Sequence, residues 1–117
     1  MNEFPEFMRH PSNKIDPATQ FTKGIEGYVF DGANGSQMAF WTFLEAGKSA
    51  EHVHEYDEYF VVVQGRYTLS IHGQLILMPP GAEYHIPAGV RHGGEAIAGT
   101  RTIHAFGGKR ARRQAQR

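Results

Sequence analysis

GKSAEHVHEYDEYFVVVQG, residues 47–65, is the stretch of this 117-residue chain that says most about its fold and its site. Within it, His52 and His54 are separated by one residue, so on an extended strand both imidazoles leave from the same face. Glu58 lies four positions beyond His54, and a bend over 55–57 would return its carboxylate to that face. The three side chains can therefore meet one metal ion. Taken alone, a His-x-His pair is more often an ordinary pair of surface or core histidines.

A fourth ligand has to come from elsewhere in the chain, and His92 is the best placed. It follows a segment in which Pro87 and Gly89 predict a turn that can aim one side chain into the mouth of a barrel. The chain contains no cysteine, so thiolate ligands, disulfides and a cysteine nucleophile are excluded. Three imidazoles and one carboxylate leave two positions open around an octahedral ion. This donor set predicts one divalent metal ion, Mn²⁺, Fe²⁺ or Ni²⁺, with Zn²⁺ and Cu²⁺ also compatible.

The rest of the chain predicts short strands joined by tight turns. Between closely spaced glycines lie runs rich in Val, Ile, Tyr, Phe and Thr, and we identify no convincing helix. Residues 64–66 and 72–74 have the composition of hairpin turns. Six or more short strands at regular spacing indicate an all-β sandwich or barrel, whose closure removes exposed edges. The clearest strands are expected over residues 38–45, 58–64, 67–72, 74–78, 83–86 and 100–106.

These motifs resemble those of the cupins, in particular small single-domain cupins of the conserved-barrel type. Residues 47–65 match the first cupin motif, with four residues instead of the usual five between the first glycine and the first histidine. Residues 81–92 match the second motif, and Ala96 stands where a polar residue, often asparagine, is usual. The resemblance implies a double-stranded β-helix, or jelly-roll, barrel. It also implies that four residues are the metal ligands: His52, His54, Glu58 and His92.

We expect an N-terminal arm over residues 1–22, a barrel over 23–108 and a basic tail over 109–117. The arm contains three prolines and shows no clear period, which places it outside the barrel. Its apolar side chains need cover from the barrel or from a partner subunit, and we predict a homodimer. Five of the nine tail residues are basic, although the formal net charge of the chain is zero.

A basic tail of this kind could contact RNA, DNA or an acidic surface. No aromatic residue is interleaved with the charges, so we favour a solvated, disordered end and expect no nucleic-acid partner. Apolar runs are short, as in residues 60–63, and none approaches the roughly 20 residues needed to cross a bilayer. The acidic start of the chain has no secretory signal pattern. We therefore expect a cytoplasmic protein with no membrane partner.

Strand periodicity suggests further residues near the ion. If Glu58 points inward, alternate side chains along its strand do so too: Phe60, Val62 and Gln64. His85 lies in a strand that leads to the ligand turn and is our candidate for a catalytic acid or base, with a hydrogen-bonded structural role left open. For His104 a structural role is favoured. Three side chains close to the ligands in sequence could orient the imidazoles: Glu51, Tyr56 and Tyr59.

Fold alone does not fix the reaction. We expect a metalloenzyme that acts on a small oxygenated molecule, with dioxygenase and isomerase or lyase chemistry both compatible with the open ligand positions. The alternative is a non-catalytic module that binds a sugar or an organic acid through the metal. A structural or storage role is the weakest interpretation, because such a protein would not need four converging ligands.

Overall fold

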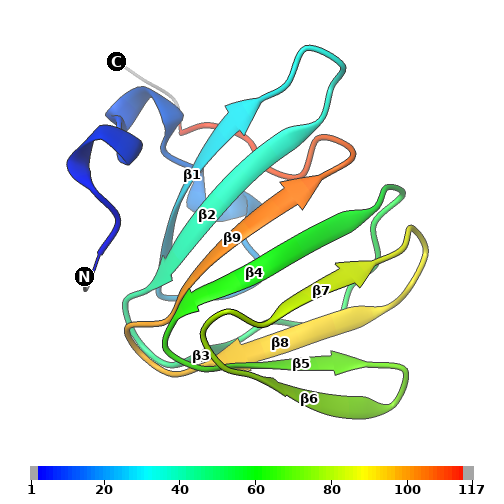
Figure 1. Ribbon diagram of the computed structural model, residues 1–117. Coiled ribbons are helices and arrows are strands. Elements are labelled where there is room, and N and C mark those ends of the chain that lie inside the picture. Colours follow the sequence, from blue (N-terminus) through cyan, green and yellow to red (C-terminus); the bar gives the residue numbers. More distant parts are fainter. Residues whose placement is uncertain (1–2, 115–117) are drawn as a thin grey trace.

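Two antiparallel β-sheets face each other and enclose the core of the computed structural model, which describes residues 3–114 (Figure 1). One sheet has the strand order β1-β2-β9-β4-β7, and the other has the order β3-β8-β5-β6. The strands are β1 (Ile25–Asp31), β2 (Gln37–Phe43), β3 (Gly47–Lys48), β4 (Glu58–Gln64), β5 (Tyr67–Ile71), β6 (Gln74–Met78), β7 (Glu83–Ile86), β8 (His92–Ala96) and β9 (Arg101–Phe106).

The all-β prediction is confirmed. No α-helix occurs within the described range, where the helical elements are three short 3₁₀ turns in the arm: η1 (Glu6–Met8), η2 (Pro11–Asn13) and η3 (Pro17–Thr19). None of them is long and apolar enough to span a membrane. The expected strands over residues 58–64, 74–78 and 83–86 have the observed bounds. Those over 67–72 and 100–106 differ by one residue at one end, and that over 38–45 differs by one residue at its start and two at its end.

Three strands, β1, β3 and β8, were not predicted from the sequence. β1 contains Glu26 and Gly27 in its first half, and β3 is only two residues long. β8 begins His92-Gly93-Gly94, and glycine is a poor strand former. The two glycines are buried, and a Cβ on Gly94 would lie 2.0 Å from the Tyr67 hydroxyl. Close packing of neighbouring side chains therefore explains a strand that local propensity does not predict.

Side chains along β4 alternate between the interior and the outer face, and this alternation directs Glu58 into the barrel. Glu58, Phe60 and Val62 are buried, whereas Tyr59 between them is exposed. Glu58 pairs with Phe106 on β9 and with Ile86 on β7, so the central part of the larger sheet surrounds it. The inward direction predicted for Phe60 and Val62 is confirmed, whereas Gln64 is half-buried and follows a register shift after Val62.

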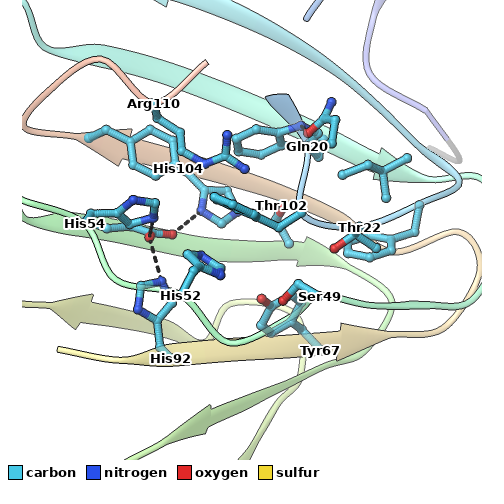
Figure 2. A pocket seen from close by; sticks show the side chains of 16 residues that line it. Gln20, Thr22, Ser49, His52, His54, Tyr67, His92, Thr102, His104 and Arg110 are labelled. Atoms are coloured by element: carbon cyan, nitrogen blue, oxygen red, sulfur yellow. Dashed lines mark hydrogen bonds and ion pairs between the residues drawn. The ribbon is translucent and has the colours of Figure 1, made fainter. Parts of the chain in front are cut away.

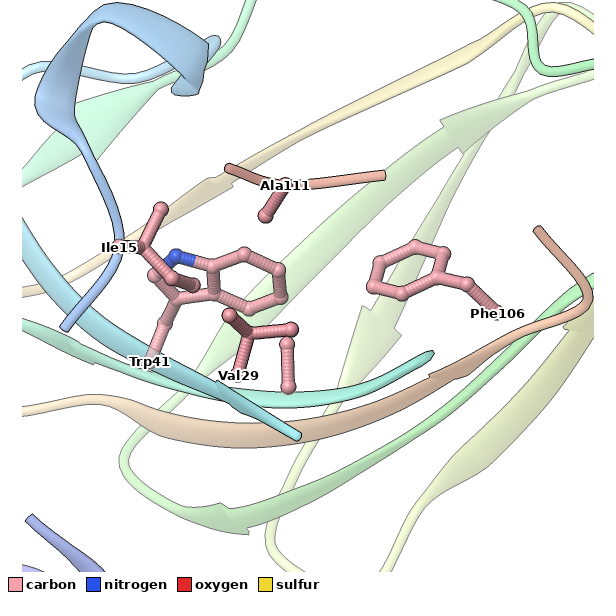
Figure 3. Packing of buried hydrophobic residues seen from close by; sticks show 6 residues of the cluster. Ile15, Val29, Trp41, Phe106 and Ala111 are labelled. Atoms are coloured by element: carbon pink, nitrogen blue, oxygen red, sulfur yellow. The ribbon is translucent and has the colours of Figure 1, made fainter. Parts of the chain in front are cut away.

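The core between the sheets falls into two clusters. One lies below the site and joins both sheets: Phe60, Val62, Leu69, Ile71, Met78 and Ile86. The other closes the opposite end and includes side chains from the arm and from the tail: Ile15, Val29, Ala39, Trp41, Phe106 and Ala111 (Figure 3). Because Ile15 and Ala111 belong to this second cluster, both terminal segments are part of the packed core.

The N-terminal arm lies against its own barrel. Phe4 is 4% exposed and packs on Phe40 and Tyr28, on the outer face of the larger sheet. Ile15 donates its backbone N–H to the Gly27 carbonyl at 2.8 Å. Phe4 and Ile15 of the arm are thus covered within one chain, whereas Phe7 is 83% exposed. The homodimer stays a prediction, to be tested by light scattering.

The tail differs from the expectation of a disordered end over the part that the structure describes, residues 109–114. Ala111 is 3% exposed, and the Gln114 N–H bonds the Lys14 carbonyl at 2.7 Å. Arg113 forms an ion pair with Asp31 on β1. These backbone bonds and the buried alanine explain why six residues of basic composition pack on the barrel; residues 115–117 lie outside the described range.

Candidate metal centre

A small cavity of about 60 Å³ opens between the sheets and holds the predicted ligands (Figure 2). Its floor is formed by β4, β8 and β9, and its rim includes residues of the arm and of the tail. The lining is mixed: imidazole, carboxylate, hydroxyl and guanidinium groups lie beside aromatic rings. Such a combination of apolar walls and a few convergent polar groups is typical of a small-molecule site.

Three histidines converge at one end of this cavity. One ring nitrogen from each of His52, His54 and His92 lies within 4.8 Å of the other two. The segment with the first two is fixed to β8, because His52 and His92 exchange backbone hydrogen bonds of 2.8 and 3.0 Å. The Gly89 N–H bonds the His54 carbonyl at 2.9 Å. The predicted meeting of the His-x-His pair with the distant histidine is confirmed.

The hydrogen bonds of these histidines fix which ring nitrogen is available. His52 Nδ1 lies 2.8 Å from the Ala50 carbonyl, and His92 Nδ1 lies 2.9 Å from the Val90 carbonyl. Because a carbonyl only accepts, each Nδ1 carries the proton, and in a neutral ring Nε2 keeps its lone pair. His54 Nε2 is buried and makes no hydrogen bond. All three rings can thus offer a nitrogen to a cation.

Glu58 lies beside the histidines and is 6% exposed. Its Oε1 is 3.2 Å from His92 Nε2 and 3.5 Å from His54 Nε2. Its Oε2 accepts a 2.8 Å hydrogen bond from His104 Nδ1. Burial alone would raise the pKa of Glu58, but the hydrogen bond from His104 and the nearby imidazoles of His54 and His92 outweigh burial and lower it. A charged carboxylate is therefore stable next to the three rings.

The surroundings shift the pKa values of two of these histidines in opposite directions. Burial lowers the pKa of His52 to about 4, so its imidazole is neutral at physiological pH. For His92, burial favours a lower pKa, but the hydrogen bond with Glu58 reverses the direction and raises it, so a metal ion would have to displace a proton from His92 Nε2. Three imidazole nitrogens beside one carboxylate, with no sulfur, form a donor set for a divalent first-row cation. The residues present therefore fit one metal ion.

His104 provides the support for Glu58, a role that sequence reasoning did not assign. Its Nε2 lies 2.9 Å from the Thr102 hydroxyl, and its ring stacks on Phe60 at 4.9 Å. His104 pairs with Phe60 across β4 and β9, so its side chain emerges beside Glu58. The pairing register would have revealed this neighbour, but the register is not visible in the sequence.

His85, our candidate for a catalytic acid or base, lies outside the cavity. His85 pairs with Tyr59 across β4 and β7, and Tyr59 alternates with the inward-facing Glu58. Both therefore point to the outer face. His85 Nε2 lies 3.1 Å from Asp57 Oδ2, and its side chain is 53% exposed. It does not line the cavity, and the alternative of a hydrogen-bonded histidine describes it.

Of the three side chains expected to orient the imidazoles, Tyr56 contacts one of the metal-site histidines. Its ring stacks on His54 at 4.9 Å. Tyr59 is exposed on the outer face, and Glu51 is exposed beside Gly93. A ring stacked on His54 restricts the rotation of that imidazole.

The rim of the cavity comes from segments that the sequence analysis left outside the site. Phe21 of the arm stacks on His52 at 4.1 Å. Arg110 of the tail lies over the Phe21 ring at 4.4 Å and over the Trp41 ring at 5.6 Å. Gln20 accepts a 2.8 Å hydrogen bond from the Trp41 indole. The arm and the tail therefore contact each other across the mouth of the cavity.

Two facing antiparallel sheets around a histidine cluster define a small β-barrel protein with an internal site suited to a metal. The family model described as "Cupin domain" matches residues 39–106, and the chain belongs to this family. The resemblance inferred from the two motifs is thereby confirmed. The match includes the three histidines and Glu58, and it ends before the tail that carries Arg110.

Solved structures share the fold at low sequence identity. KdgF from Halomonas sp. is 20% identical with a TM-score of 0.65, over 86% of this chain and 93% of that one. An RmlC-like cupin from Shewanella frigidimarina is 18% identical with a TM-score of 0.69, over 81% and 82% of the two chains. The polyketide cyclase RemF from Streptomyces resistomycificus is 18% identical with a TM-score of 0.69, over 92% and 84%. A search of curated proteins found no match.

Proposed function

We propose that the chain is a metalloenzyme that acts on a small oxygenated molecule, with one divalent ion held by His52, His54, Glu58 and His92. The convergence of three ring nitrogens beside a buried carboxylate carries the proposal. Mn²⁺, Fe²⁺ and Ni²⁺ suit these ligands best, and Zn²⁺ and Cu²⁺ are also compatible. The ion, once bound, would supply Lewis-acid or oxygen-activating chemistry to oxygens of the substrate.

The other residues of the cavity would position the substrate and hold its protons. His104 keeps Glu58 charged and oriented through the bond to Oε2. Burial raises the pKa of Tyr67, so its hydroxyl stays protonated and can donate a hydrogen bond into the cavity. Phe21 and Trp41 restrict access of water from the rim. Isomerase or lyase chemistry and dioxygenase chemistry both fit these roles, and the cyclase RemF is one enzyme with this fold.

The second candidate is a module that binds a sugar or an organic acid through the metal without changing it. One observation favours it. Apart from the three histidines, the titratable side chains that line the cavity are Glu58, Tyr67, His104 and Arg110. Glu58 and His104 bond each other, and the other two stay protonated at neutral pH. No lining side chain within the described range is therefore a free base.

The first experiment measures metal content in protein purified without chelators. About one divalent ion per chain is expected in the wild type, and His92→Ala and Glu58→Gln should each retain far less. His72→Asn is the matched control, because His72 lies in an exposed turn at φ 53°, a conformation that asparagine tolerates. Full metal occupancy in His92→Ala would show that the site is misplaced.

The second experiment separates the enzyme from the binding module. Metal-loaded protein is incubated with diketones, hydroxy acids, phenols and uronates, and products are measured by mass spectrometry. Turnover that is lost in Glu58→Gln supports the enzyme. Thermal stabilisation by a compound that is recovered unchanged, with no turnover of any other, would favour the binding module instead.

A further inference from the structure

Arg110 places a positive charge at the cavity, from a segment that the family model does not cover. Figure 2 shows its guanidinium on the opposite side of the cavity from His92, with the space between them lined by the site residues. The residue is half-buried, and its Nη1 donates to the Thr19 carbonyl at 2.6 Å. Its guanidinium carbon lies over the Phe21 ring, 4.4 Å from the ring centre, in a cation–π contact.

This guanidinium has no acidic partner within residues 3–114: no carboxylate lies within 4.0 Å of it. Among the described residues its side chain hydrogen-bonds only the Thr19 carbonyl, and its other N–H groups have no acceptor there. Burial lowers the pKa of Arg110, while Tyr56 and Glu58 act in the opposite direction, and the group stays charged at neutral pH. Burying half of a cation without a counter-ion costs free energy, and this cost is reduced when an anionic ligand binds to it.

The segment around Arg110 is held by a specific anchor, Gln37 on β2. Gln37 is 4% exposed, and its Oε1 accepts from the backbone N–H groups of Arg110 and Ala111 at 2.6 and 2.8 Å. Its Nε2 donates to the Ala111 carbonyl at 3.0 Å and to Asp31 Oδ1 at 2.8 Å. Three of the four hydrogen bonds of this amide hold the tail, so the fold itself places Arg110 over the cavity.

We infer that Arg110 binds a carboxylate of the substrate or ligand, whose hydroxyl or carbonyl oxygen faces the three histidines. The inference rests on the proposed function and narrows its substrate class to small hydroxy or oxo carboxylic acids, acidic sugars included. A planar guanidinium with one nitrogen occupied by Thr19 still presents an edge that matches the two oxygens of a carboxylate. Phe21 and Trp41 supply the apolar walls between the two ends.

The test compares acids with their uncharged counterparts by isothermal titration calorimetry. Lactate is paired with lactamide, and glucuronate with glucose, and each is titrated into the full chain both loaded with Ni²⁺ and treated with chelator. The variants are Arg110→Gln, Arg110→Lys and the control Arg112→Gln, which removes the same charge from an exposed position in the same segment. Metal content and melting temperature are measured for each variant.

The wild type should bind at least one acid about tenfold or more tightly than its neutral counterpart. Arg110→Gln should weaken that binding by about 10- to 100-fold with metal content unchanged, and Arg112→Gln should not. Arg110→Lys should lose less affinity for the acid, because it keeps the charge without the planar edge. If Arg110→Gln does not fold, Arg110→Lys is compared with Arg112→Gln in its place. Equal binding of acid and neutral compound, or equal losses in the two glutamine variants, would overturn the inference.

The experiment tests the proposed metal site and the proposed anion site independently. If the wild type holds no metal, the proposed function fails, yet acid binding that depends on Arg110 can still be measured in chelator-treated protein. If metal binds in full but no acid is preferred over its neutral counterpart, the proposed function stands and the carboxylate inference falls.

Discussion

His104 donates a 2.8 Å hydrogen bond to Oε2 of Glu58, which leaves Oε1 directed at His54 and His92. The pair joins neighbouring strands of the larger sheet, β4 and β9, and both side chains are buried. Thr102 completes the chain of contacts at the other ring nitrogen. One histidine thus fixes both the charge and the direction of the carboxylate, although it is not in the cluster of three.

Replacing His104 by alanine should therefore weaken metal binding without removing a ligand. The variant leaves Glu58 Oε2 without its donor, and loss of such a supporting contact costs about 10- to 100-fold in metal affinity. Competition with a chelator of known affinity measures the change. Tyr59→Ala is the control, since Tyr59 lies on the same strand as Glu58 and points to the outer face. Unchanged affinity in His104→Ala would show that Glu58 needs no support from the second strand.

The depressed pKa of His52 makes a prediction for the stability of metal-free protein. Its pKa is about 4 in the folded chain against an ordinary 6.5, so between these values the unfolded state binds the proton and the folded state does not. The free energy of unfolding should therefore fall as the pH is lowered from about 6.5 toward 4. His52 is only partly buried, and with solvent screening we expect about 1 kcal/mol from this residue.

Chelator-treated wild type and His52→Asn are compared by urea unfolding at several pH values. Asparagine keeps an amide donor for the Ala50 carbonyl but does not titrate. The raised pKa of His92 acts in the opposite sense, with a contribution that is lost as the pH rises, and it is present in both proteins. The difference between the two curves therefore reports on His52. Parallel curves would contradict a neutral, desolvated imidazole at this position.

The sequence predicted the metal cluster better than its surroundings, and the reason is the range of the interactions. The spacing of His52 and His54 is local and depends only on strand geometry. His92 followed from its own turn motif. His104 could not be placed, because its neighbour Glu58 is 46 positions away and is reached only through strand register. The same register directs His85 away from the cavity, where periodicity alone left both faces open.

The composition of the tail did not predict that residues 109–114 pack on the barrel, for a related reason. A run with several arginines predicts a solvated end, because single residues carry no information on distant partners. The tail is fixed by Gln37, which lies 73 positions before Arg110 and bonds its backbone. A buried amide needs polar partners, but the burial of Gln37 is visible only in the structure.

Gln37→Ala should release the tail while leaving the barrel folded. The substitution removes four hydrogen bonds, two from tail N–H groups and one to a tail carbonyl among them, and we expect a loss of about 1–3 kcal/mol. Trypsin should then cleave after Arg110 and Arg112 faster than in the wild type, as measured by mass spectrometry. Gln74→Ala on the exposed edge of β6 is the control. Equal cleavage rates in the two variants would mean that the anchor lies elsewhere.

Gly65 and Gly73 offer a matched pair of turn glycines: Gly65 lies between β4 of the larger sheet and β5 of the smaller sheet, and Gly73 lies in the hairpin of β5 and β6. Both have a positive φ, 84° and 72°, so alanine at either position carries the strain of the left-handed region, about 1 kcal/mol. They differ in space: a Cβ on Gly65 would lie 2.6 Å from Thr100 Cα, whereas one on Gly73 meets nothing within 4 Å. Gly65→Ala should therefore lower the melting temperature more than Gly73→Ala, by an additional 4–16 °C or so, because overpacking adds about 1–3 kcal/mol. Thermal melts of the two metal-free variants test this, and equal shifts would show that the turn at Gly65 moves away from Thr100 at little cost.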